Sequence, residues 1–135
     1  MKNEIYVDAE GAIFGRLCSF VAKKALEGNE LHVVNSEKTI ITGNRKFILH
    51  DYSELKKKGG HSLKGPRISA VSYKMLKRAI RGMIPNHRYG TGKETLTRVK
   101  CYNGVPEEFK DKKFIKIESP RKIKFMTLKD LSQSI

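Results

Sequence analysis

Residues 4–35 read EIYVDAEGAIFGRLCSFVAKKALEGNELHVVN and contain, in order, the patterns of a strand, a helix and a second strand. β-Branched and aromatic residues at the centre of 4–9 predict the first strand. Apolar residues recur at helical spacing from 13 to 26, and Gly28-Asn29 is a stop signal for that helix. The second strand is the apolar run 31–35. This order predicts a parallel pair of strands joined by a crossover helix, in a sheet covered on both faces.

The rest of the chain continues this α/β pattern. Ser72 is predicted to cap a helix that buries Ile80 and Met83. Residues 56–68 are too polar and too rich in glycine for a packed element, so they predict a basic loop that is flexible in the free protein. The other predicted elements are strands at 39–42, 100–102 and, at an edge, 114–117, and helices at 44–55, 73–83 and 93–99.

Positive charge is concentrated in the middle of the chain. The 135 residues include 28 Lys and Arg against 14 Asp and Glu, a net charge of +14. Residues 55–105 hold 13 of the basic side chains and one acid, Glu94. Such a concentration repels itself, and a polyanion neutralises it. A membrane binder would pair it with a hydrophobic helix face carrying Trp or Phe, which residues 55–105 lack, so nucleic acid is the predicted partner.

Several other classes of protein find no support in the sequence. Cys18 and Cys101 form no CxxC pair, and the four histidines lack metal-ligand spacing. No signal peptide is apparent, and no apolar run approaches the roughly 18 residues of a membrane span, which predicts a cytoplasmic protein. No GxSxG or comparable nucleophile motif occurs. We therefore expect no enzyme activity, metal, cofactor or small-molecule substrate.

Two glycine-containing segments match nucleotide-binding loops only in part. Gly11 and Gly15 follow a strand and open a helix, but a dinucleotide fingerprint needs a third glycine. We expect a tight turn at Gly11 and close helix–sheet packing at Gly15. Residues 90–93, GTGK, lack both the earlier glycine and the following Ser or Thr of a triphosphate loop. Their glycines either let the backbone approach a phosphate or turn it sharply between helices.

The charge pattern with the most information is a stripe of cations on one predicted helix. Lys74, Lys77, Arg78 and Arg81 follow i, i+3, i+4, i+7 spacing, which places them on one face over about 10 Å, at 1.5 Å per residue. No acid is interleaved, so the four cations repel one another, whereas an ordinary solvated face would mix both signs. We interpret the stripe as a phosphate-binding ridge.

Further cations are predicted to extend this ridge. Arg16 lies in the first turn of a helix, where the dipole disfavours a cation without an anionic partner, so it is either an RNA contact or a plain surface residue. Tyr73, Tyr89 and Tyr102 either stack on unpaired bases or pack in the core. The cations of 56–67 would form an arm that orders against RNA. The full predicted RNA-binding set is Arg16, Lys56, Lys57, Lys58, Lys64, Arg67, Lys74, Lys77, Arg78, Arg81, Arg88, Lys93, Arg98 and Lys100.

Short motifs along the chain occur in a specific order. They are YVDAEG (6–11), GRL (15–17), VVNSEK (33–38), TGN (42–44), RGMIP (81–85) and RVKCYNGVP (98–106). Together they resemble the universal large-subunit ribosomal protein L13 family over roughly residues 5–106. One departure is RISA at 67–70, where the family often has Arg-x-Pro-Ser or Arg-x-Pro-Asp. The short length and the Gly-Val-Pro segment are similar to archaeal members.

The resemblance carries expectations for fold and function. It implies a three-layer α/β/α domain over 1–106, with a four-stranded parallel sheet of order 3-2-1-4, and a charged tail, 107–135, that packs on the domain or on the ribosome. It also implies a structural role in the large subunit, with binding to ribosomal RNA beside neighbouring ribosomal proteins and a part in early assembly. Residues 81–83 would face the RNA. A free-standing RNA-binding translational regulator is the alternative.

Overall fold

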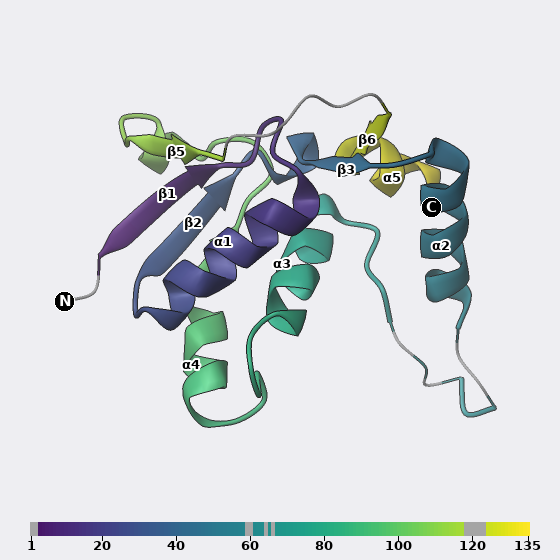
Figure 1. Ribbon diagram of the computed structural model, residues 1–135, viewed down its shortest axis with the longest axis horizontal. Coiled ribbons are helices and arrows are strands. Elements are labelled where there is room, and N and C mark those ends of the chain that lie inside the picture. The colour runs from purple at the N-terminus through teal and green to yellow at the C-terminus, as the bar shows by residue number, and fades with distance from the viewer. Residues whose placement is uncertain (1–2, 59–60, 64, 66, 118–123) are drawn as a thin grey trace.

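A four-stranded parallel sheet of order β4-β2-β1-β5 forms the centre of the molecule (Figure 1). The computed structural model describes residues 3–58, 61–63, 65, 67–117 and 124–135. The sheet contains β1 (Glu4–Asp8), β2 (Glu30–Val34), β4 (Val99–Cys101) and β5 (Phe114–Lys116), and a separate ribbon pairs β3 (Ile40–Thr42) with β6 (Phe125–Thr127). The helices are α1 (Phe14–Leu26), α2 (Arg45–Lys57), α3 (Ser72–Gly82), α4 (Gly90–Thr97) and α5 (Leu128–Ser134), with 3-10 turns η1 (Ser36–Lys38) and η2 (Glu107–Phe109).

The α/β class and the four-stranded parallel sheet are confirmed, but the expected strand order 3-2-1-4 is wrong. β3 does not lie beside β2; it leaves the sheet and pairs antiparallel with β6. The reason is chain length, because only η1 and its flanking residues join β2 to β3, and a parallel neighbour needs a crossover of about a dozen residues or more. β4 takes the place beside β2, since α2, α3 and α4 supply a long crossover. The predicted edge strand is confirmed as β5, which pairs with β1.

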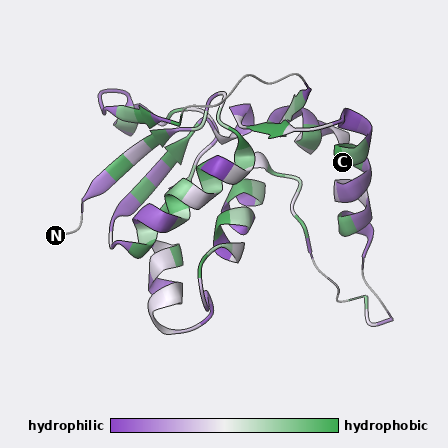
Figure 2. Cartoon of the chain, in the orientation of Figure 1, coloured by the Kyte–Doolittle hydropathy of each residue, from purple (hydrophilic) through white to green (hydrophobic). Residues whose placement is uncertain are grey.

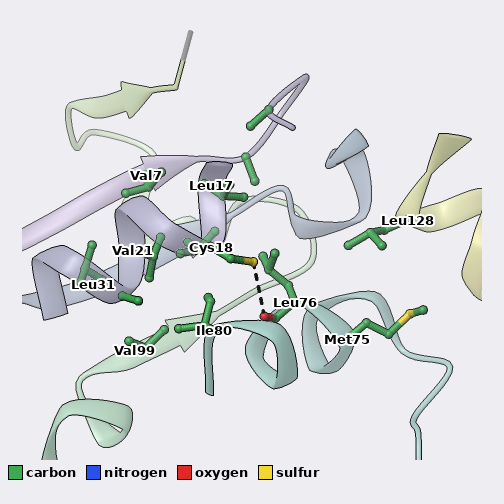
Figure 3. Packing of buried hydrophobic residues seen from close by; sticks show 14 of the residues in the cluster. Val7, Leu17, Cys18, Val21, Leu31, Met75, Leu76, Ile80, Val99 and Leu128 are labelled. Carbon is green, nitrogen blue, oxygen red and sulfur yellow. Dashed lines mark hydrogen bonds between the residues drawn. The ribbon is translucent and has the colours of Figure 1, made fainter. Parts of the chain in front are cut away.

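One face of the sheet carries the hydrophobic core. Val7, Leu31 and Val99 point to this face, where they pack with Val21 of α1 and Ile80 of α3 (Figure 3). Hydrophobic and hydrophilic residues alternate along both helices (Figure 2), as expected for amphipathic helices that cover a sheet. Burial of these apolar side chains is the main source of stability for the fold.

The opposite face carries aromatic rings. Tyr6 and His32 lie on neighbouring strands in register, and their rings stack with centroids 5.0 Å apart. Phe109 of η2 covers them, with its centroid 4.9 Å from that of His32, and Tyr102 and Phe114 complete the cluster. The resemblance implies a helical third layer, but in the described residues η2 and these rings occupy this face. The segment before η2 contains an Asn-Gly pair and a proline, which disfavour an α-helix there.

Residues of the C-terminal part of the chain share the main core. Leu128 and Leu131 of α5 are fully buried in the same cluster as Val7. The Thr127 hydroxyl accepts a hydrogen bond from the Asp130 N–H and caps α5. The division of the chain at residue 106 stays a prediction. None of the helices in the described residues combines the length and apolar composition that a membrane crossing requires.

Candidate nucleic-acid interface

α3 holds the predicted cation stripe against the core. Its buried side chains include Met75 and Leu76, and the Leu76 carbonyl oxygen lies 3.9 Å from Cys18 Sγ of α1 (Figure 3). Two details of the prediction are wrong. Val71, not Ser72, is the N-cap residue, and Met83 is 44% exposed because the helix ends at Gly82. The cations lie on the remaining surface, where Lys74 is exposed and the other three are half-buried.

The stripe lines one side of a groove of about 330 Å³ between α3, the segment that precedes it and α4. Arg78 Nη1 donates a hydrogen bond to the Arg67 carbonyl oxygen at 3.3 Å, which fixes the preceding segment to the helix. None of the lining cations forms a salt bridge within the described part of the chain. A groove with several unpaired cations and no carboxylate is suited to bind a polyanion. The lining residues are Arg67, Ser69, Lys74, Lys77, Arg78, Arg81 and Leu96.

Two of the other predicted cations have different surroundings. Arg98 Nη1 donates to the Ala25 carbonyl oxygen at 3.2 Å, and Arg98 Nη2 lies 4.0 Å from Glu94 Oε2. Lys100 pairs in register with His32, so its side chain belongs to the aromatic face of the sheet and not to the groove. The structure does not bring these two residues together with the α3 stripe. Arg98 is hydrogen-bonded to α1, and Lys100 lies on the face of the sheet opposite to the one that α3 covers, because side chains alternate along a strand.

The remaining predicted cations lie outside the groove lining. Lys56 and Lys57 belong to the last turn of α2 and Lys58 follows it, so α2 extends two residues past its predicted end. Cations at this end of a helix also interact favourably with its dipole. Lys64 lies outside the described residues. Arg16, Arg88 and Lys93 are exposed on α1, on the loop before α4 and on α4.

The tyrosines and glycines near the groove have distinct roles. Tyr102 packs in the aromatic cluster, whereas Tyr89 is 72% exposed. A Cβ at Gly92 would meet the Pro85 and Asn86 carbonyl oxygens at 2.2 Å, so this glycine lets α4 pack closely on the preceding turn. Of the two readings left open for residues 90–93, the sharp turn between helices is supported by the left-handed φ of +60° at Gly90, whereas the approach of the backbone to a phosphate stays a prediction.

The glycine motif at the start of α1 is only partly as predicted. Gly11 has φ +72°, a left-handed conformation that a turn of this kind favours. The expected close helix–sheet packing at Gly15 is wrong, because Gly15 is exposed and a Cβ there would meet nothing within 4 Å. Asp8 at the end of β1 accepts hydrogen bonds from Asn35 Nδ2 and the Glu10 N–H, both at 3.0 Å, which gives this carboxylate a structural role.

Sequence spacing missed one cluster of potential ligands. Glu4, Glu30 and His32 each place one ligand-type atom within 4.8 Å of those of the other two. The residues lie on adjacent parallel strands, so only the register reveals them. Burial lowers the pKa of His32, and the positive charge of Lys100 lowers it further. The negative charges of Glu4 and Glu30 act in the opposite direction and raise it. Nearby, Glu4 Oε2 accepts a hydrogen bond from the Tyr6 hydroxyl at 2.9 Å, which raises the pKa of Tyr6.

Comparison of the sequence with known proteins identifies the family of this chain. The family model described as "Ribosomal protein L13" matches residues 2–108. The chain is 39% identical over 132 residues to "Large ribosomal subunit protein uL13" of Picrophilus torridus, covering 96% of this chain and 94% of that one. It is 43% identical over 112 residues to the protein of the same name from Methanosarcina barkeri (82% and 79% covered) and 39% identical over 135 residues to that from Methanococcus maripaludis (96% and 95% covered).

Proposed function

Because the chain belongs to the ribosomal protein L13 family, we propose that the groove beside α3 binds the phosphate backbone of large-subunit ribosomal RNA. The protein is a structural component of the large ribosomal subunit and not an enzyme. The observation that carries the proposal is the lining of the groove, which has five cations and no carboxylate among the described residues.

The chemistry of the groove supports a backbone contact. Each phosphate that a Lys or Arg neutralises releases counterions, which gives a favourable and salt-dependent free energy of binding. Arg78 uses one N–H for the Arg67 carbonyl and keeps the rest of its five donors for an anion. Lys77 and Arg81 are half-buried, so their charges are less screened than those of fully exposed side chains. Recognition through the backbone also implies modest base specificity.

The finer statements about partners and location belong to the same proposal. We infer contacts with neighbouring large-subunit proteins, a role in early assembly, and a place on cytoplasmic ribosomes. The cations exposed outside the groove, Arg16, Arg88 and Lys93, would contribute further RNA contacts. A free-standing regulator of translation would instead remain in the light fractions when ribosomal subunits are separated by sedimentation, so co-sedimentation with large subunits distinguishes the two roles.

A triple substitution tests the groove. We expect Lys77→Ala, Arg78→Ala and Arg81→Ala together to weaken binding to large-subunit ribosomal RNA and to reduce the slope of log affinity against log salt by about 3, one unit per lost phosphate contact. The matched control removes three exposed cations outside the groove and outside the predicted RNA-binding set, Lys110, Lys113 and Lys129, with the same change in net charge. If both triple variants lost affinity and slope equally, overall charge and not the groove would bind the RNA.

A further inference from the structure

We propose a second RNA contact on the β3–β6 ribbon, in which an unpaired base stacks on Phe125 while Arg45 and Lys124 bind the adjoining phosphates. The inference rests on the proposed function, since it assumes that the partner is RNA. It adds a separate surface and a different kind of recognition. The hollow beside the ribbon shares no lining residue with the α3 groove, and Figure 1 shows the ribbon and the start of α2 away from α4, so this contact is not an extension of that groove.

The ribbon brings together residues that are about 80 positions apart in the sequence. Thr42 and Phe125 are partners in the antiparallel register, and the Gly43 N–H donates to the Lys124 carbonyl oxygen at 3.0 Å. α2 begins immediately after this pairing, with Asn44 as its N-cap. The result is a hollow of about 320 Å³. Its lining residues are Gly43, Asn44, Arg45, Lys124 and Phe125.

Strand alternation explains why an aromatic ring is available in this hollow. Met126 points into the core and is 2% exposed, so its neighbour Phe125 points outward and is 51% exposed. The hollow is at the lower end of the volumes that accept small ligands, which are about 300 to 1,000 Å³. A base is flat and apolar on its faces, and an aromatic side chain can stack on any of the bases because each has a π-face.

The charge around the ring favours RNA over a protein partner. Arg45 and Lys124 are exposed, and neither forms a salt bridge within the residues that the structure describes. No carboxylate lines the hollow. A ring flanked by unpaired cations is the arrangement that single-stranded nucleic acid requires, with phosphates at the cations and a base on the ring. An apolar protein partner would gain nothing from the two cations.

A single-tryptophan variant tests the contact directly, because the chain contains no Trp. Phe125→Trp places the indole in the hollow, and Phe47→Trp is a matched control at a 70% exposed position of α2 outside the hollow lining. We expect a single-stranded oligoadenylate of about 12 nucleotides to quench the fluorescence of Phe125→Trp and leave that of Phe47→Trp unchanged. Equal quenching at both positions, or none at Phe125→Trp, would overturn the proposal.

Substitutions of the ring separate stacking from apolar contact. Phe125→Leu keeps an apolar side chain without an aromatic face and should weaken oligoadenylate binding about tenfold, whereas Phe125→Tyr should retain it. Wild-type oligoadenylate affinity in Phe125→Leu would show that the ring does not stack on a base and would overturn the inference.

The α3 triple variant distinguishes failure of this inference from failure of the proposed function. That variant should lose affinity for large-subunit ribosomal RNA but keep oligoadenylate binding at Phe125. If the α3 triple variant lost affinity for large-subunit ribosomal RNA but no Phe125 substitution changed oligoadenylate binding, only the second contact would be overturned. If the wild-type protein bound neither RNA, both proposals would fail.

Discussion

Arg98 Nη1 donates a hydrogen bond to the backbone carbonyl oxygen of Ala25, 3.2 Å away and 73 positions earlier in the chain. Ala25 lies in the last turn of α1, and its carbonyl oxygen also accepts a hydrogen bond from the Gly28 N–H at 3.1 Å. The Arg98 side chain is only 22% exposed, so this bond is made in a partly buried setting. A residue that the sequence assigns to RNA therefore joins α4 to α1.

We expect Arg98→Ala to lower the free energy of unfolding by about 1 to 3 kcal/mol, because it removes a hydrogen bond from a charged and partly buried donor. RNA affinity should change little. Urea unfolding and RNA titration of the same preparation measure the two effects. Lys93→Ala, at an exposed position on α4, is the control and should leave stability unchanged. A stable Arg98→Ala protein with weakened RNA binding would restore the original assignment.

Gly92→Ala should destabilise the protein by more than about 2 kcal/mol, because the added Cβ would lie 2.2 Å from two backbone carbonyl oxygens. Gly82→Ala is the matched control, since a Cβ there meets nothing within 4 Å and alanine favours a helix. Thermal unfolding of the two variants provides the comparison. Equal melting temperatures would show that the turn before α4 can move away from the helix.

Acid should destabilise the fold through His32. Burial lowers its pKa below the ordinary value of 6.5, so the unfolded chain takes up a proton at higher pH than the folded protein does. The stability that neutral His32 contributes is complete above about pH 6.5 and is lost as the pH falls below it. His32→Phe keeps an aromatic ring beside Tyr6 and should reduce the loss of unfolding free energy between pH 7 and pH 5.

Urea unfolding of the wild-type protein and of His32→Phe at the two pH values measures this effect. An unchanged slope in His32→Phe would mean that the carboxylates, and not this imidazole, determine the response to acid.

Both cysteines should resist alkylation in the folded protein. Burial raises the pKa of Cys18 and of Cys101 to about 12, although the charge of Lys77 partly opposes this shift at Cys101. The reactive thiolate is therefore scarce near pH 8. Iodoacetamide labelling followed by mass spectrometry should detect slow modification of the native chain and fast modification in guanidinium chloride. Rapid labelling of Cys101 alone, which is half-buried, would show that β4 opens at the edge of the sheet.

Local patterns predicted the elements whose causes are local. The apolar spacing from 13 to 26 identified α1, and the cations at positions 74, 77, 78 and 81 could be assigned to one face because a helix fixes the relation between residues three and four apart. The strand–helix–strand order likewise indicated the parallel pairing of β1 with β2, which the register confirms. Each of these inferences needs only neighbouring residues and the geometry of one element.

Long-range pairing determined the rest. The position of β3, the side of the sheet on which Lys100 lies, and the bond from Arg98 to α1 all depend on partners far away in the sequence. The same holds for the hollow around Phe125, whose cations are Arg45 at the start of α2 and Lys124 just before β6. Periodicity specifies which residues share a face of an element, but only the packing of the elements decides what that face meets. The cation stripe was therefore visible in the sequence, whereas the groove that it lines required the folded chain.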